Sequence, residues 1–147
     1  MRRKSLDQSP CPVARSLDLI GDWWSLLIIR DAFLGRRRFG EFQKSLGLSK
    51  NILTQRLRGL VDDGILNLVP ASDGSAYLEY VLEPKGRDLF PVIVALRQWG
   101  TEHCFGEDAC DTTLVERATG KPVRKLAVQA EDGTLLAPRD TMLAERR

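Results

Sequence analysis

Five polar side chains recur at helical spacing within one short segment of the chain, LSKNILTQRLRGLVDDGIL, residues 48–66. They are Lys50, Asn51, Thr54, Gln55 and Arg58. On a helix they share one face, and the opposite face carries an apolar stripe. The stripe consists of Leu53, Leu57, Leu60 and Val61. Asn and Gln amides pair bidentately with adenine, Lys and Arg pair with guanine, and a Thr methyl contacts the thymine methyl. The segment therefore has the chemistry to read base edges in DNA.

The alternative for this face is an ordinary solvated surface, which every soluble helix needs. Such a surface usually mixes both charge signs, whereas this one has no carboxylate before Asp62. Ser49 is the expected N-cap of the helix, and three arginines lie one element upstream, at Arg36, Arg37 and Arg38. We expect Ser49 and these arginines to contact phosphates, which fixes register without reading sequence.

The charge of the chain is distributed unevenly. Residues 1–60 hold 12 Lys and Arg against 5 Asp and Glu, a net +7, whereas residues 61–147 hold 10 against 15, a net −5. A cationic half in a protein of net charge +2 favours a polyanionic partner, although a solvated charged face is the simpler alternative. No apolar run approaches the roughly 18 residues of a membrane span, so we expect a cytoplasmic protein with no membrane partner.

The elements that position these side chains follow from periodicity. Helical spacing predicts four helices, at residues 11–20, 23–34, 39–46 and 49–63. The second is apolar nearly all round, which indicates a central buried position. Alternation predicts strands at 65–69 and 76–82. A long amphipathic helix follows at 85–105, in which Pro91 predicts a kink or a late start.

This order of elements predicts a mainly α fold with a small β-hairpin wing, the winged helix-turn-helix, in which the helix at 49–63 enters the major groove. Three regions are expected. Residues 1–10 form a basic N-terminal arm, and residues 11–105 form a DNA-binding and dimerisation domain. Residues 106–147 form a C-terminal extension, with a small β-hairpin from strands at 112–116 and 123–129.

Three collinear segments carry a family resemblance: CPVARSLDLIGDWWSLLIIRD, RRFGEFQKSLGLSKNILTQRLRGLVDDGIL and YLEYVLEPKGRDLFPVIVALRQWG. Through them the chain resembles the HxlR-type winged-helix transcriptional regulators of bacteria and archaea, distant relatives of MarR-type repressors. The resemblance implies a dimeric repressor or activator of transcription, with repression the expected outcome.

The same resemblance implies a two-fold dimer in which the first and last long helices pair. These helices offer apolar faces at Val13, Leu17, Ile20, Val92, Leu96 and Trp99. One small core does not require all of them, although an ordinary core within one chain is the alternative. A dimer would place two recognition helices about 34 Å apart, which predicts a pseudo-palindromic operator in double-stranded DNA.

The chain departs from the family in three places. Its predicted wing turn, Ser72, Asp73, Gly74 and Ser75, has no cation for the minor groove, which weakens the case for wing contact. Asp22 and Trp23 precede the family tryptophan Trp24, where a Gly or Lys is common. The tail has no paired cysteines.

Cys11 matches a cysteine found near the start of many family members, where it resembles a redox or electrophile sensor in some. At the N-cap before Pro12, with Arg15 one turn on, the helix dipole would stabilise a thiolate. The alternative is a packed, inert thiol. Cys104 and Cys110 are less suited, because Glu107 and Asp108 lie beside them. With His103 they offer three ligands where a closed zinc site needs four, so no metal or other cofactor is expected.

Three alternatives remain. An enzyme is disfavoured, since the chain has one histidine and no phosphate-binding Gly loop or HExxH motif. A winged-helix protein-protein adaptor would bind its partner without a steep dependence on salt. A regulator responsive to a small-molecule effector would use an aromatic pocket between the dimer helices, for which the candidate residues are Trp23, Trp24, Phe33, Phe90 and Trp99.

Overall fold

A computed structural model describes residues 4–107 and 109–146. The chain divides into two compact units, Met1–Ile93 and Val94–Arg147. The boundary falls inside the last long helix, so residues 94–105 group with the predicted extension at 106–147. The elements in chain order are α1 (Pro12–Ile20), α2 (Trp23–Phe33), α3 (Phe39–Leu46), α4 (Lys50–Asp62), β1 (Leu66–Pro70), β2 (Leu78–Leu82), α5 (Pro84–Arg87), α6 (Phe90–His103) and the 3-10 turn η1 (Pro138–Asp140).

The first four helices form where the sequence predicts them, within a residue or two at each end. Pro12 opens α1, and the Asp22 carboxylate caps α2 by accepting from the Ser25 backbone N–H at 3.0 Å. α3 ends at Gly47, whose φ of 64° only glycine adopts readily. The tight turn between α3 and α4 therefore depends on this glycine.

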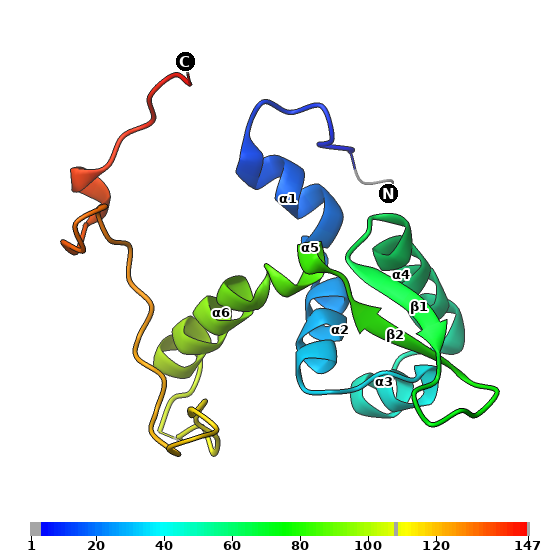
Figure 1. The fold of residues 1–147 in the computed structure, drawn as a ribbon. Coiled ribbons are helices and arrows are strands. Elements are labelled where there is room, and N and C mark those ends of the chain that lie inside the picture. Colours follow the sequence, from blue (N-terminus) through cyan, green and yellow to red (C-terminus); the bar gives the residue numbers. More distant parts are fainter. Residues whose placement is uncertain (1–3, 108, 147) are drawn as a thin grey trace. The chain divides into compact units, whose positions relative to one another are not determined.

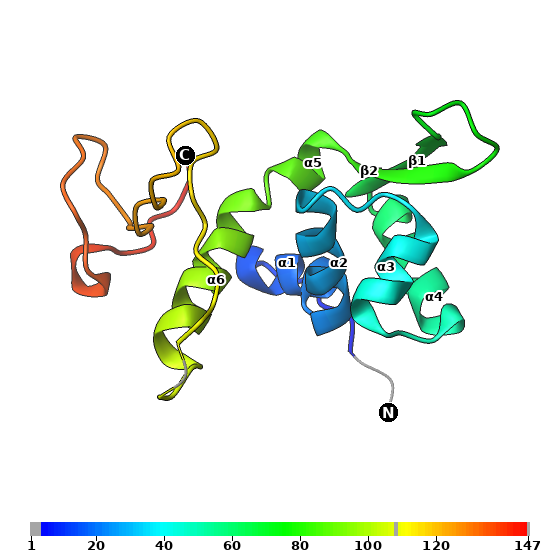
Figure 2. The same ribbon diagram turned by 90° about the horizontal axis from the view of Figure 1, so that it is seen from below.

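The core of the first unit surrounds α2. This helix lies between α1 and the α3–α4 pair in Figures 1 and 2, and it contacts β2 as well. Ile28 and Ile29 of α2 are fully buried against Phe42 of α3 and the leucine stripe of α4. The predicted central position of α2 is confirmed, although Trp23 at its start is exposed.

β1 and β2 pair as an antiparallel hairpin, with Leu66 opposite Leu82 and Pro70 opposite Leu78. β1 is shifted from the predicted 65–69, and β2 is shorter than the predicted 76–82. The reason is that the ladder ends at the pair of Pro70 with Leu78. Ala71 then donates its N–H to the Tyr77 carbonyl at 3.0 Å and closes a loop. Gly74, with φ 76°, forms the predicted turn at the tip of this loop, seen beyond the hairpin in Figure 2.

The predicted helix at 85–105 is broken into α5 and α6. Proline has no N–H to donate, and in a continuous helix the ring of Pro91 would clash with the Arg87 carbonyl. Pro91 instead occupies the first turn of α6, where both problems vanish. The predicted late start is confirmed.

The strands predicted at 112–116 and 123–129 are wrong. Only isolated bridges form there, Val115 with Pro122 and Gln129 with Leu135, although Gly133 makes its predicted turn with φ 90°. Alternating apolar residues alone do not produce a ladder when no core covers them, and Val128 remains 65% exposed. Of the basic arm, residues 1–3 lie outside the described residues, and the Leu6 N–H donates to Asp18 at 2.7 Å.

Candidate nucleic-acid interface

α4 is fixed from both its start and its inner face. The Ser49 hydroxyl caps the helix by accepting from the Ile52 N–H at 3.3 Å. Leu53, Leu57 and Leu60 bury the inner face almost completely. Burial of one face leaves the opposite face of the helix in solvent.

That outer face brings together four of the five predicted base-reading residues, since Lys50, Asn51, Gln55 and Arg58 are all exposed. Thr54 is half-buried, and its hydroxyl donates to the Lys50 carbonyl at 2.7 Å. The Thr54 hydroxyl is therefore engaged within the helix, and its methyl group is the part suited to a thymine contact.

Arg56, which the sequence analysis did not single out, connects α4 to α2. Its Nε lies 3.4 Å from the carboxylate of Asp22, the same group that caps α2. Asp22 thus holds the start of one helix and the middle of another. No spacing rule links positions 22 and 56, so this contact is visible only in the fold.

The three arginines between α2 and α3 each face a carboxylate. Arg36 lies 3.6 Å from Asp31, which is fully buried, and Arg37 lies 3.8 Å from Glu79. Arg38 has the closest pair, 2.5 Å from Asp73, and its guanidinium lies 4.9 Å from the centre of the Tyr77 ring. The basic turn is therefore less cationic than its sequence implies.

Asp31 is the buried end of this arrangement. Its Oδ1 accepts two hydrogen bonds from Arg30, at 2.8 and 3.0 Å, and also faces Arg36. Its backbone carbonyl accepts from the Arg36 N–H at 3.1 Å. A buried carboxylate needs such partners to offset its desolvation, so the turn that carries the arginines is built around Asp31.

Glu41 fixes the start of α3. Its carboxylate accepts from the N–H groups of Arg38 at 2.9 Å and Arg37 at 3.2 Å. These two hydrogen bonds, first that from Arg38, lower the pKa of Glu41. The Arg37 carbonyl accepts in turn from the Tyr80 N–H at 2.7 Å, which ties the basic turn to β2.

The tip of the wing is held from inside. Asp73 accepts from the backbone N–H of Ser75 at 2.9 Å with one oxygen and from Arg38 with the other. The Ser75 hydrogen bonds, with the Arg38 contact adding to them, lower the pKa of Asp73 to about 2. The Ser72 N–H donates to Glu79 at 2.9 Å. The wing has no cation of its own, but Arg38 reaches it from α3.

The charge of Arg58 on α4 acts on the hairpin. Burial raises the pKa of the Tyr80 hydroxyl on β2, and the positive charge of Arg58 opposes that rise. α4 also contacts β1 of the same hairpin, so the polar helix face and the wing belong to one packed unit. Such a surface, a polar helix face flanked by a wing and a basic turn, fits the grooves of a DNA duplex.

Residues 19–108 match the HxlR-like helix-turn-helix family, which is more than half of the chain. The chain belongs to this family. A relative from Mycobacterium tuberculosis (strain ATCC 25618 / H37Rv), named an uncharacterized HTH-type transcriptional regulator, is 48% identical over 91 residues. The match covers 62% of this chain and 58% of that relative, so the chain spans less than two thirds of the length of that relative.

Two solved structures are similar over more of the fold. The crystal structure of PA1607, a candidate transcription factor, is 56% identical, with a TM-score of 0.91, and covers 96% of this chain and 99% of that chain. The redox regulator HypR in its oxidized form is 31% identical with a TM-score of 0.58, and covers 67% of this chain and all of that chain. These relatives are named as regulators or transcription factors.

The faces expected to pair two copies of this HxlR-like chain are exposed, with one exception. Val13 and Leu17 on α1, and Val92, Leu96 and Trp99 on α6, are all exposed. Ile20 is 7% exposed and belongs to the core around α2. The last turn of α1 thus packs inward within one copy, and a place for Ile20 in the dimer interface stays a prediction.

Cys11 is exposed at the N-cap of α1, so it is not a packed core thiol. Arg15, expected one turn on to support a thiolate, uses its Nε to donate to the Ser9 carbonyl. Cys110, which the sequence ranked lower, has its thiol 3.5 Å from the Thr112 carbonyl, and hydrogen bonds to Thr112 with nearby Arg97 lower its pKa. Asp108 lies outside the described residues.

The predicted aromatic residues pair with near neighbours. The rings of Trp23 and Trp24 are 5.9 Å apart, and those of Phe33 and Phe90 are 5.2 Å apart. Trp99 contacts His103. An effector pocket among them stays a prediction.

Residues 4–107 and 109–146 contain neither a candidate metal site nor a candidate membrane-spanning helix. No group of three or more His, Cys, Asp or Glu side chains is arranged to hold a metal ion. No helix in these ranges has the length and apolarity to cross a bilayer.

Proposed function

We propose that this chain is a sequence-specific, DNA-binding transcriptional regulator that reads an operator through α4. The observation that carries the proposal is the outer face of α4, where Lys50, Asn51, Gln55 and Arg58 are exposed together above a fully buried leucine stripe. Family membership supports the same reading, since the HxlR-like family is a helix-turn-helix family.

Within this proposal the contacts divide into two kinds. The amides and cations of α4 read base edges, while Ser49 and the basic turn at Arg36, Arg37 and Arg38 contact phosphates. Arg37 has a side chain about half exposed, at 51%, and is the best placed of the three for a phosphate. The wing loop at 72–75 lies beside the same surface, and Arg38, which reaches this loop, contacts the sugar-phosphate backbone of the DNA.

A binding assay on genomic fragments tests this proposal. Replacing a base-reading arginine, Arg58→Ala, should weaken operator binding by about 1–3 kcal/mol and relax sequence preference, whereas Arg37→Ala should weaken all DNA binding and reduce the salt slope by about 1. Arg117→Ala, an exposed arginine of the extension, is the matched control for lost charge. If binding to a partner changes neither with salt concentration nor with Arg58→Ala, the protein-protein adaptor is favoured.

We propose further that two copies pair through the exposed faces of α1 and α6 and bind a pseudo-palindromic operator. Isolated apolar side chains on a surface are ordinary, but faces such as Leu96 with Trp99 at 61% exposure mark contact sites. Leu96→Glu should convert a dimer into a monomer in sedimentation and abolish binding to a full operator. Leu34→Glu alters an equally apolar, exposed residue outside these faces and should do neither.

Cys11 is proposed as a sensor of oxidants or electrophiles. Its exposure and its position at the start of α1, beside Val13 of the pairing face, support this role. An oxidant should change operator affinity in the parent protein and in Cys104→Ser, but not in Cys11→Ser. If the oxidant changes the operator affinity of all three proteins equally, the redox effect does not arise from Cys11.

A further inference from the structure

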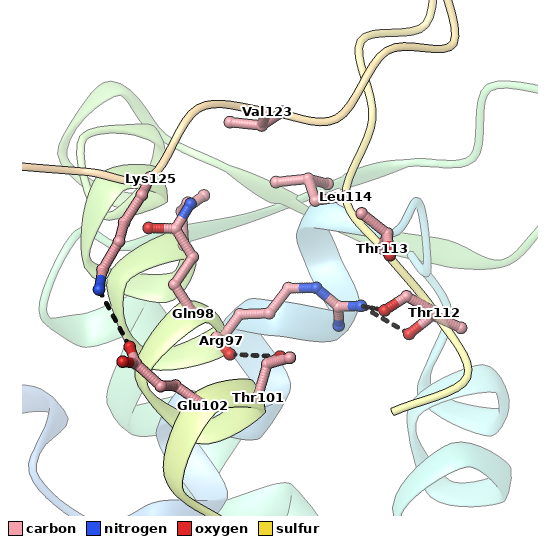
Figure 3. Close-up of a pocket in the computed structure, with 10 residues that line it drawn as sticks. Arg97, Gln98, Thr101, Glu102, Thr112, Thr113, Leu114, Val123 and Lys125 are labelled. Atoms are coloured by element: carbon pink, nitrogen blue, oxygen red, sulfur yellow. Dashed lines mark hydrogen bonds and ion pairs between the residues drawn. The ribbon is translucent and has the colours of Figure 1, made fainter. Parts of the chain in front are cut away.

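One face of α6 forms the floor of a cavity of about 270 Å³ in the second unit. Figure 3 shows its lining, which α6 and the segment at 112–125 supply together. From α6 come Val94, Arg97, Gln98, Thr101 and Glu102. This i, i+3, i+4, i+7, i+8 spacing is that of a single helical face.

The wall of the cavity is attached to α6 by polar contacts. Arg97 donates to the Thr112 carbonyl at 2.9 Å and also to its hydroxyl. Gln98 accepts from the Leu126 N–H at 2.8 Å and donates to the Arg124 carbonyl at 3.2 Å. Thr112, Arg124 and Leu126 all lie beyond residue 108, where the family match ends. The wall of the cavity is thus supplied by the extension, whereas its floor on α6 lies within the family match.

The chemistry of the lining selects a ligand. Val94, at 4% exposure, forms an apolar surface with Leu114 and Val123. Lys125 is paired with Glu102 at 3.0 Å, so these two charges cancel. Arg97 is left as the unbalanced cation, and only one of its guanidinium nitrogens, the one bound to Thr112, makes a hydrogen bond within the described chain.

We propose that this cavity binds a small amphipathic monoanion, with its apolar part against Val94, Leu114 and Val123 and its carboxylate on Arg97. A guanidinium with free N–H groups binds a carboxylate through charge-assisted hydrogen bonds. The volume is slightly below the roughly 300–1,000 Å³ of drug-sized sites, so the ligand is small. Beside the site, the Cys110 thiol donates to the same Thr112 carbonyl as Arg97.

The cavity is separate from the proposed pairing surface of the same helix. Leu96 and Trp99 are exposed, and their positions lie on the other side of α6 from positions 94, 97, 98 and 101. The site therefore stands whether or not two copies pair through α6, and it does not depend on DNA binding.

Octanoate and 1-octanol form a matched pair of probes, equal in apolar chain and different in charge. Titration of the full chain, followed by backbone and side-chain amide NMR, should show octanoate shifting the Gln98 side-chain amide and the amides of Thr113 and Leu114. Octanol should bind the same residues at least tenfold more weakly, because it lacks the charge-assisted contact with Arg97.

Four variants test the assignment. Arg97→Gln should reduce octanoate affinity to that of octanol, and Arg97→Lys should restore part of it. Arg124→Gln removes the same charge from an adjacent exposed residue whose side chain does not line the cavity, and it should leave octanoate binding unchanged. Leu114→Trp fills the cavity and should abolish binding of both probes, with the dispersion of the α6 resonances after residue 94 reporting that this unit remains folded.

The proposal is overturned if octanoate binds the parent, Arg97→Gln and Leu114→Trp proteins equally. It is also overturned if the shifted amides cluster at Val13 and Leu17, which would identify a general apolar surface. Octanoate affinity that rises as the protein is diluted, in parallel with dissociation of a dimer, would mean that a second copy occupies the cavity. Loss of DNA binding in other variants leaves each of these outcomes unaffected.

Discussion

Removal of the Asp73 carboxylate should make DNA binding more sensitive to salt. In the free protein Asp73 holds Arg38 at 2.5 Å, at the tip of a wing that has no cation of its own. Asp73→Ala therefore removes the closest carboxylate of Arg38, on the surface proposed to face DNA, and leaves Glu79 at 3.9 Å as its more distant partner. The substitution requires no new position of Arg38, because this side chain already extends from the start of α3 to the wing.

The expected magnitude follows from counterion release. Each additional neutralised phosphate steepens the dependence of log Kobs on log[salt] by about 0.9. Over a fourfold range of salt, from about 50 to 200 mM, a slope change of that size corresponds to a factor of about 3.5. Asp73→Ala should bind a fixed DNA fragment more tightly than the parent, and its advantage should be about 3.5-fold larger at the low end of this range.

Fluorescence anisotropy with a labelled duplex at five or six salt concentrations measures both quantities. Asp132→Ala is the control for net charge, since Asp132 accepts from the Thr134 N–H in the same kind of turn but lies in the extension. The double variant Arg38→Ala, Asp73→Ala should lose the gain. An unchanged or shallower slope for Asp73→Ala would refute the reasoning, because Arg38 would then not be restrained by Asp73.

Three further predictions concern the stability of the scaffold. Gly86→Ala should lower the free energy of unfolding by about 1–3 kcal/mol in urea titrations, because a Cβ there would lie 2.3 Å from the Ile65 carbonyl oxygen, whereas Gly59→Ala in open helix should be neutral or stabilising by up to about 1 kcal/mol. Asp31→Ala should cost about 3 kcal/mol in the same titrations, because it removes a fully buried partner of two arginines. The stabilising contribution of the Asp73 carboxylate should be complete above its ordinary pKa of 3.8 and be lost as pH falls through about 2, and a carboxyl ¹³C titration midpoint near 4 would contradict it.

The helices were predictable because their signals are local. The leucine stripe of α4 and its Ser49 cap lie within one segment. The glycine that ends α3 and the proline in the first turn of α6 each act on the helix in which or beside which they lie. The outer face of α4 followed directly, since a helix with one buried side has its remaining side exposed.

The pairings of the basic turn were not predictable, because they join distant positions. Arg38 and Asp73 are 35 residues apart. No spacing rule predicts that Asp31, near the end of α2, is fully buried. The strand prediction for the extension was wrong for a different reason. Its alternating residues satisfy a strand pattern, but a ladder also needs a covered face, and Val128 has none. Ile20 shows the same limit, since helical spacing does not tell which turn of α1 faces inward.

Gln98 has a consequence for how the extension can change in evolution. Its side-chain amide both accepts from and donates to the main chain at 124 and 126, as a neighbouring strand would. A side chain that recognises backbone groups places no demand on the residue types across from it. The identities of residues 124–126 are thus free to drift while the path of this segment is retained, and the lining of the cavity can be re-specified without rebuilding its frame.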